Sequence, residues 1–300
     1  MAFNNEQASE HQLPPVTPEA LAALGYEAVY TNCQPEETPE ALFVADQNHK
    51  EDLTEPTSSV VQTFWAAGSS ALVEGRVNDP GNALAIPDEG VPRSWENEYV
   101  YSLAIAVLQK RIELGESAER LRNDYRAALS SASGSSEDIA RKRSASEQAS
   151  QARNNAEQLG ASISRIRTNI LADTVAEQAA ENPGGRVFAV AGGLHLLNKR
   201  AGSVDVGINE GLRERLETEH SDLRYMVARQ TNPPKAAPED VEERIRQMKQ
   251  RTDGLSEQAL QEALQQGQWP QEAAQYLTES EMELCRRLWG EPPTPNVAEA

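Results

Sequence analysis

A chain of 300 residues with a formal charge of -19 at pH 7 is unsuited to nucleic acid or to an anionic membrane surface as its main partner, because both would repel it. The length is enough for one large domain or two modest ones, but with 5% aromatic residues much of the chain must be solvated helix or tail. The two cysteines, Cys33 and Cys285, have no metal-type spacing and predict buried or idle thiols in a reducing compartment.

The amino terminus lacks the apolar core of a secretory signal and no run approaches a membrane span. We therefore expect a cytoplasmic protein, or one exported by a secretion system that needs no leader.

Three regions are expected along the chain. Residues 1–30 form a polar lead-in and a short helix, which Thr17 caps. Residues 31–230 form an α/β core, and a helical insertion or arm occupies residues 116–182 within it. Residues 231–300 form a helical extension with a disordered tail.

The core begins with a strand, a helix and a second strand. Ala41–Ala45 is a continuous apolar run, which is typical of a strand buried on both faces. A helix begins near Pro56 and ends at Gly68, and Ala71–Val73 is the next strand, closed by Glu74. A strand–helix–strand unit this short implies a right-handed crossover and parallel pairing. Glu74 is therefore expected at the edge of the sheet where the first strand also ends.

Long helices are expected after the second strand. Residues 76–93 are rich in proline, glycine and asparagine, and predict a lid, a binding loop or a plain surface excursion. Ser94 is expected to cap a helix that runs to about Leu114, and a shorter helix covers Ser117–Leu129. Beyond a serine-glycine hinge, residues 137–181 predict one or two long helices whose first half is solvated.

One arginine lies within an apolar face of the last long helix. At 100° per residue Arg167 falls inside a stripe of large aliphatic side chains. The stripe consists of Leu159, Ile163, Ile166, Ile170, Leu171 and Val175. An arginine in such a face is costly unless it meets a carboxylate or a ligand, so we expect Arg167 to point inward and to be paired. The alternative is a side chain that extends past the helix edge to water.

A third buried strand ends in two glycines and a histidine. The segment Arg186–Leu197 has the sequence R-V-F-A-V-A-G-G-L-H-L-L, in which the apolar run is followed by Gly192, Gly193 and His195. A helix and a last strand, Leu223–Ala228, complete the core. The predicted fold class is therefore α/β, with a central, mostly parallel sheet built from βαβ units and flanked by helices.

Polar side chains follow three of the predicted strands. His49 follows the first strand, Glu74 the second and His195 the third, and the carboxyl ends of parallel strands meet at one edge of a sheet. The two histidines would supply a base and a second donor near pH 7, and Glu74 would orient or activate one of them. Arg167 would hold a carboxylate or an oxyanion. Candidates for substrate binding are Asp46, Gly192 and Gly193, because Asp46 adds an acid and the glycines allow close approach.

These motifs, in this order, resemble the superfamily that joins Tiki/TraB proteins, the ChaN haem-uptake proteins and the erythromycin esterases. The first motif is Ala45–His49, with the sequence A-D-Q-N-H, and the second is L-V-E-G at residues 72–75. The third begins at Arg167, with the sequence R-T-N-I-L-A-D-T-V, and the fourth is Gly192–Leu196, with the sequence G-G-L-H-L. The resemblance covers residues 41–229 and leaves both tails outside.

The resemblance implies a hydrolase of the esterase or protease kind, acting on a small-molecule or peptide substrate. His49 or His195 would activate water, Glu74 would assist, and Arg167 would stabilise developing negative charge. Two histidines and a carboxylate also suit a divalent metal. His49, Glu74 and His195 are therefore the candidate ligands for Zn²⁺, Mn²⁺ or Co²⁺ in a site that could equally use no metal.

Two further functions stay open. The ChaN resemblance implies a ligand-binding module, for example for haem. The other alternative is a catalytically degenerate interaction protein, such as an injected bacterial effector, whose helical arm or carboxyl-terminal extension recruits a protein partner. Degeneracy is suggested by Ala45 and Asp46, which stand where the family usually has glycine and glutamate, and by Thr168 in place of asparagine. His220 ends a charged helix, and we expect it at the surface.

Overall fold

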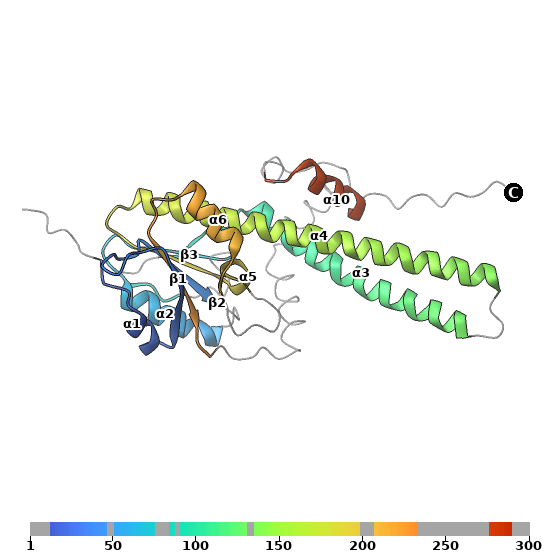
Figure 1. Ribbon diagram of the computed structural model, residues 1–300, viewed down its shortest axis with the longest axis horizontal. Coiled ribbons are helices and arrows are strands. Elements are labelled where there is room, and N and C mark those ends of the chain that lie inside the picture. The colour runs from blue at the N-terminus through green and yellow to red at the C-terminus, as the bar shows by residue number, and fades with distance from the viewer. Residues whose placement is uncertain are drawn as a thin grey trace, which may run out of the picture. The chain divides into compact units, whose positions relative to one another are not determined.

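The computed structural model describes residues 13–46, 51–75, 84–87, 91–130, 135–198, 207–232 and 276–289 of the chain (Figure 1). Two compact units are present. The first, here called the sheet unit, combines Met1–Asn97 with Arg167–Ala236. The second, the helical unit, combines Glu98–Ile166 with Ala237–Ala300.

The sheet unit is built on six strands in the order β1-β8-β2-β5-β3-β4. Strands β8, β2, β5, β3 and β4 run parallel, and β1 pairs antiparallel with β8 at one edge. The strands are β1 (Tyr26–Thr31), β2 (Ala41–Asp46), β3 (Ser70–Val73), β4 (Arg93–Ser94), β5 (Val187–Gly192) and β8 (Tyr225–Gln230). The predicted α/β class with a mostly parallel sheet is confirmed.

Apolar side chains cover both faces of the central strands. Alternate residues of β2 point to opposite faces: Leu42 and Val44 join one buried cluster, and Phe43 and Ala45 join another. Helices α1 (Pro18–Ala23) and α2 (Glu51–Phe64) contribute to the first cluster. The end of helix α4 (Ser136–Glu181) and helix α6 (Glu210–Glu219) contribute to the second. The continuous apolar runs in the sequence therefore correspond to strands buried on both faces.

Strand β5 lies between the two strands of the predicted strand–helix–strand unit. Strands β2 and β3 are joined through α2, as expected, but each pairs with β5 rather than with the other. Their register brings the strand ends together, because Asp46 at the end of β2 is opposite Gly192 at the end of β5. After β5 the chain forms the four-residue helix α5 (Gly193–Leu196) and a small second sheet of β6 (Leu197–Asn198) and β7 (Gly207–Ile208).

A buried arginine holds the amino-terminal edge of the sheet. Arg186, which precedes β5, is 0% exposed, and its guanidinium donates to the carbonyls of Pro39, Phe64 and Pro14 at 3.0, 2.8 and 2.7 Å. Burial lowers the pKa of Arg186 to about 10, since no carboxylate is among these partners. The three carbonyls lie in separate segments of the chain, so this one side chain joins them.

The predicted pair of helices after residue 94 is a single helix. Ser94 was expected as a helix cap, but it lies in β4, and α3 (Glu98–Ser130) begins four residues later. The expected break near residue 115 is also wrong. Gly115 lies in open space within α3, and the cost of one glycine, about 1 kcal/mol, is too small to end a packed helix. Helix α4 likewise continues through Gly160, where an added Cβ would lie 3.7 Å from Val107 Cγ1.

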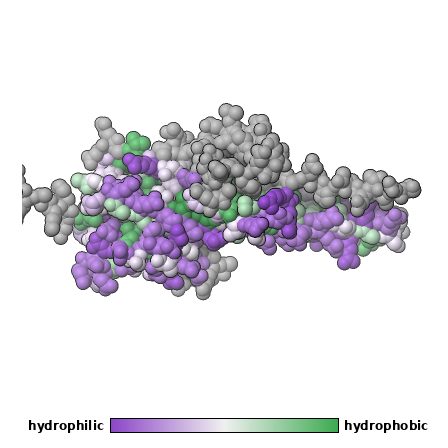
Figure 2. All heavy atoms as spheres, turned by 90° about the horizontal axis from the view of Figure 1, so that it is seen from above, coloured by the Kyte–Doolittle hydropathy of each residue, from purple (hydrophilic) through white to green (hydrophobic). Residues whose placement is uncertain are grey.

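The helical unit exposes polar residues along the first half of α4, as predicted. Exposed pairs on this stretch include Arg143–Glu147 and Arg153–Glu157, and Figure 2 shows a mostly hydrophilic surface along the long helices. Helix α10 (Glu279–Trp289) buries Cys285 and Leu288, and Thr278 caps it. The rest of the predicted extension at 231–300 lies almost entirely outside the described residues. None of the described helices is both long and apolar enough to span a membrane.

Candidate functional site

Three of the predicted site residues meet at the carboxyl edge of the sheet. Glu74 follows β3, and its Oε1 lies 2.6 Å from Nη2 of Arg167 and 3.8 Å from Nε2 of His195. The other carboxylate oxygen, Oε2, accepts a hydrogen bond of 2.5 Å from the backbone N–H of Gly192. Glu74 is therefore in contact with the guanidinium, the end of β5 and the edge of the imidazole.

The local backbone explains how these side chains reach one another. Gly75 has φ of 73°, a left-handed conformation that glycine adopts without strain, and it turns the chain directly after Glu74. At the end of β5 the short helix α5 carries His195, which is 3% exposed. Gly192 and Gly193 are not among the positive-φ glycines of the described chain. At the end of β5, Gly192 contributes its backbone N–H, which donates to Glu74.

Arg167 points inward and is paired, as the helical stripe predicted. Its side chain is 13% exposed, and it bridges two carboxylates. Besides the contact with Glu74, Nε lies 2.9 Å from Oε1 and 3.2 Å from Oε2 of Glu96, and Nη2 contacts Oε1 of Glu96 as well. The guanidinium thus binds Glu96 through Nε and Nη2 and Glu74 through Nη2.

Glu96 was not anticipated from the sequence. Its side chain is 2% exposed. The residue comes just after β4, in a segment that was predicted as the start of a helix. Had β4 been recognised as a strand, Glu96 would have matched the pattern of a carboxylate just beyond a strand end, which identified Glu74. A two-residue strand is too short to give that signal.

The electrostatics of this group follow from its burial. Burial raises the pKa of Glu96 to about 7, because the desolvation of the charged form outweighs the attraction of Arg167, and the nearby Glu74 adds to the rise. Burial lowers the pKa of Arg167, but Glu96 and Glu74 outweigh burial and raise it above its usual range. With all three groups ionised, this buried group carries a net charge of -1, which favours the uptake of one proton.

Thr168, Trp95 and Glu74 lie around the imidazole of His195. Nδ1 lies 3.0 Å from Oγ1 of Thr168, which is 2% exposed and comes directly after Arg167 in α4. The ring also packs against Trp95 with its centroid 5.6 Å away and an interplanar angle of 75°. Trp95 is itself held by a hydrogen bond of 3.2 Å from its Nε1 to the carbonyl of Val190 in β5. One nitrogen of His195 therefore contacts Thr168 and the other is directed toward Glu74.

The remaining predicted residues are placed less fully. The backbone of Asp46 ends β2 opposite Gly192, and its side chain is outside the described residues. His49 also lies outside them, as does most of the loop predicted at 76–93. Gly193 is buried and begins α5.

The described residues do not fit a metal centre by themselves. Across the described ranges, no group of three or more His, Cys, Asp and Glu side chains is arranged to hold a metal ion. The two donors of the predicted set that are described, Glu74 and His195, are opposed by the guanidinium of Arg167, 2.6 Å from the Glu74 oxygen. The third predicted ligand, His49, lies outside the described residues.

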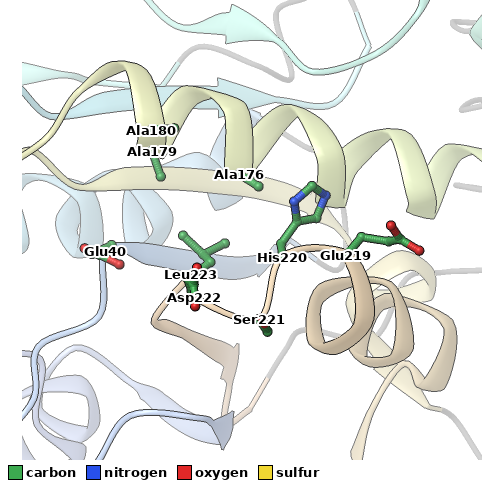
Figure 3. A pocket seen from close by; sticks show the side chains of 9 residues that line it. All are labelled: Glu40, Ala176, Ala179, Ala180, Glu219, His220, Ser221, Asp222 and Leu223. Carbon is green, nitrogen blue, oxygen red and sulfur yellow. The ribbon is translucent and has the colours of Figure 1, made fainter.

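A separate hollow lies at the opposite edge of the sheet (Figure 3). It has a volume of about 350 Å³, and Glu40 and Leu223 on its wall precede the amino ends of β2 and β8. His220, which was predicted at the surface, is partly exposed on the wall of this hollow. Its side chain is 23% exposed, and Nε2 lies 2.8 Å from Oδ1 of Asp173 on α4. This hollow is distinct from the site around Glu74.

Comparisons with known proteins give no match. No protein-family model, no curated protein and no solved structure is similar to this chain.

Proposed function

We propose that this protein hydrolyses ester or peptide bonds of a small-molecule or peptide substrate at the carboxyl edge of its sheet. The observation that carries the proposal is the 3.8 Å separation between Nε2 of His195 and Oε1 of Glu74. Two atoms at this separation share a region within about 2.8 Å of each, where one water molecule can hydrogen-bond to both. The four sequence motifs that resemble the Tiki/TraB, ChaN and erythromycin-esterase-like superfamily support the same reaction class.

In the proposed reaction His195 is the general base. Nε2 takes a proton from the water as the water oxygen attacks the carbonyl carbon of the substrate, and the protonated imidazole later donates that proton to the leaving alcohol or amine. Glu74 orients the water and stabilises the imidazolium that forms. His195 is 3% exposed, so its surroundings exclude bulk water and strengthen its electrostatic interactions with Glu74 and the bound water. Substrate binding must therefore make Nε2 accessible.

Arg167 acts in this proposal by holding Glu74. The guanidinium pairs with Glu74 and Glu96, so it holds the Glu74 carboxylate in place beside His195. His49, three residues after the end of β2, is proposed as the second histidine and the donor to the oxyanion. The site is proposed to act in the cytoplasm, and the free thiols of Cys33 and Cys285 support a reducing compartment.

The test is a panel of ester and peptide substrates with matched histidine variants. Wild type is expected to hydrolyse at least one substrate class, and His195→Ala is expected to lower kcat/KM by about 10²- to 10⁴-fold. His220→Ala is the control, because His220 pairs with Asp173 at the opposite edge and should leave the rate unchanged. If wild type and His195→Ala are equally inert across the panel, the hydrolase proposal fails.

A further inference from the structure

Thr168 stands out among the buried residues around His195 because it meets the imidazole nitrogen that faces away from Glu74. Its Oγ1 lies 3.0 Å from Nδ1 of His195, and both side chains are almost fully buried. A neutral imidazole carries its hydrogen on one nitrogen only, and the partner of the other nitrogen decides which one is favoured. Thr168 is therefore in a position to decide which nitrogen of His195 is the base.

The helical setting of Thr168 indicates which role its hydroxyl takes. Helical hydroxyls of this protein donate to the carbonyl four residues earlier in several places. These bonds are Ser59 to Glu55, Ser130 to Arg126, Ser150 to Ser146 and Thr218 to Glu214. A hydroxyl that donates in this way offers only its lone pairs to another side chain. In the interior of α4, Thr168 has the same kind of backbone around it.

We propose that Thr168 is a positioning residue that accepts a hydrogen bond from Nδ1–H of His195 and thereby leaves the lone pair on Nε2, facing Glu74. This inference deepens the proposed function and rests on it for its catalytic meaning. Proton abstraction from water at Nε2 requires that lone pair, and an Nε2–H imidazole cannot act there as a base. Trp95 packs against the imidazole, with 5.6 Å between the ring centroids.

Two consecutive residues of α4 hold the two members of the proposed pair. Arg167 holds Glu74 through Nη2, and Thr168 holds His195 through Nδ1, so a single turn of helix orients both members of the proposed pair. Neighbouring helical residues project about 100° apart, which lets one reach the carboxylates and the other the imidazole.

The experiment reads the tautomer of His195 directly. Full-length protein with ¹⁵N-labelled histidine is studied by long-range ¹H–¹⁵N correlation at about pH 9, well above the usual histidine pKa of about 6.5, and His195→Gln assigns the signals. Wild type is expected to show protonated Nδ1 and bare Nε2. Thr168→Val keeps the shape and removes the acceptor, so its His195 should shift to Nε2–H or to a mixture. Thr168→Ser keeps a hydroxyl and should retain the wild-type pattern.

The outcomes separate this inference from the hydrolase proposal. An Nε2–H tautomer in wild type, or an unchanged Nδ1–H tautomer in folded Thr168→Val, overturns the role of Thr168 whatever the activity. If Thr168→Val does not fold, the wild-type tautomer and the retained pattern of Thr168→Ser still decide the matter. The expected tautomers in a protein inert toward every substrate would sustain the positioning role and count against hydrolysis. In an active protein, Thr168→Val should lower kcat by more than tenfold with little change in KM, and Thr168→Ser should restore it.

Discussion

Replacement of Glu96 by glutamine should remove a specific part of the pH dependence of stability. The folded protein holds the pKa of Glu96 at about 7 and the unfolded chain near its ordinary value of 4.5, so the folded state binds this proton more tightly. Its contribution to the free energy of unfolding is fully present below pH 4.5 and is lost as the pH rises through about 7. A rise of this size corresponds to a loss of about 3 kcal/mol between those limits.

The assay follows the sheet unit, because Glu96 and Arg167 both lie in it. Urea unfolding at about pH 5 and about pH 8 is followed by brief hydrogen exchange and mass spectrometry of the peptide that contains β5. The quantity of interest is the free energy of unfolding of Glu96→Gln minus that of wild type. This difference should increase by about 2–3 kcal/mol from the lower to the higher pH, whatever its absolute value.

Glu27→Gln provides the matched control. Glu27 also pairs with an arginine in the sheet unit, Arg229, but its side chain is 45% exposed, so its loss should change stability by less than about 1 kcal/mol. Equal pH dependence in Glu96→Gln and wild type would refute the reasoning, and so would a difference that shrinks as the pH rises. Either result would mean that the desolvation of Glu96 is offset by Arg167.

Three further changes test the packing of the described chain. Arg186→Met removes three charge-assisted hydrogen bonds and leaves buried carbonyls unpaired, so urea unfolding of the sheet unit should show a loss of about 3–5 kcal/mol, and a loss under about 1 kcal/mol would contradict this. Ser70→Ala should be neutral or stabilise by up to about 1 kcal/mol in thermal unfolding, because Oγ of Ser70 is buried without a hydrogen-bond partner among the described residues. Thr278→Ala should cost α10 about 1 kcal/mol and speed its hydrogen exchange without affecting β5, and unchanged exchange would argue against the cap.

The strands that carry the site could be predicted because they are buried on both faces. Ala41–Ala45, Ala71–Val73 and the run after Arg186 contain almost nothing but apolar residues, and so short an apolar run between turn residues is typical of a strand inside a sheet. Strand β1 was missed for the opposite reason. Tyr26–Thr31 is an edge strand that is mostly half-buried, and its residues do not alternate cleanly.

The site could be predicted in part, because its members follow two different rules. Glu74 and His195 follow strand ends, and parallel strands collect such residues at one edge, while Arg167 was found through the helical stripe. Neither rule identified Glu96 or Thr168 from the sequence. Glu96 comes after a two-residue strand, and Thr168 is a small residue that any helix face tolerates, so their contacts depend on tertiary packing.

Glutamine in place of Glu74 tests the central claim most directly, that His195 and Glu74 act together on water. Initial rates on the best ester or peptide substrate are compared for wild type, Glu74→Gln and the control Glu27→Gln, with hydrogen exchange of β5 to verify folding. We predict that Glu74→Gln lowers kcat/KM by at least about 100-fold while Glu27→Gln stays close to wild type. A folded Glu74→Gln with the wild-type rate would contradict the account.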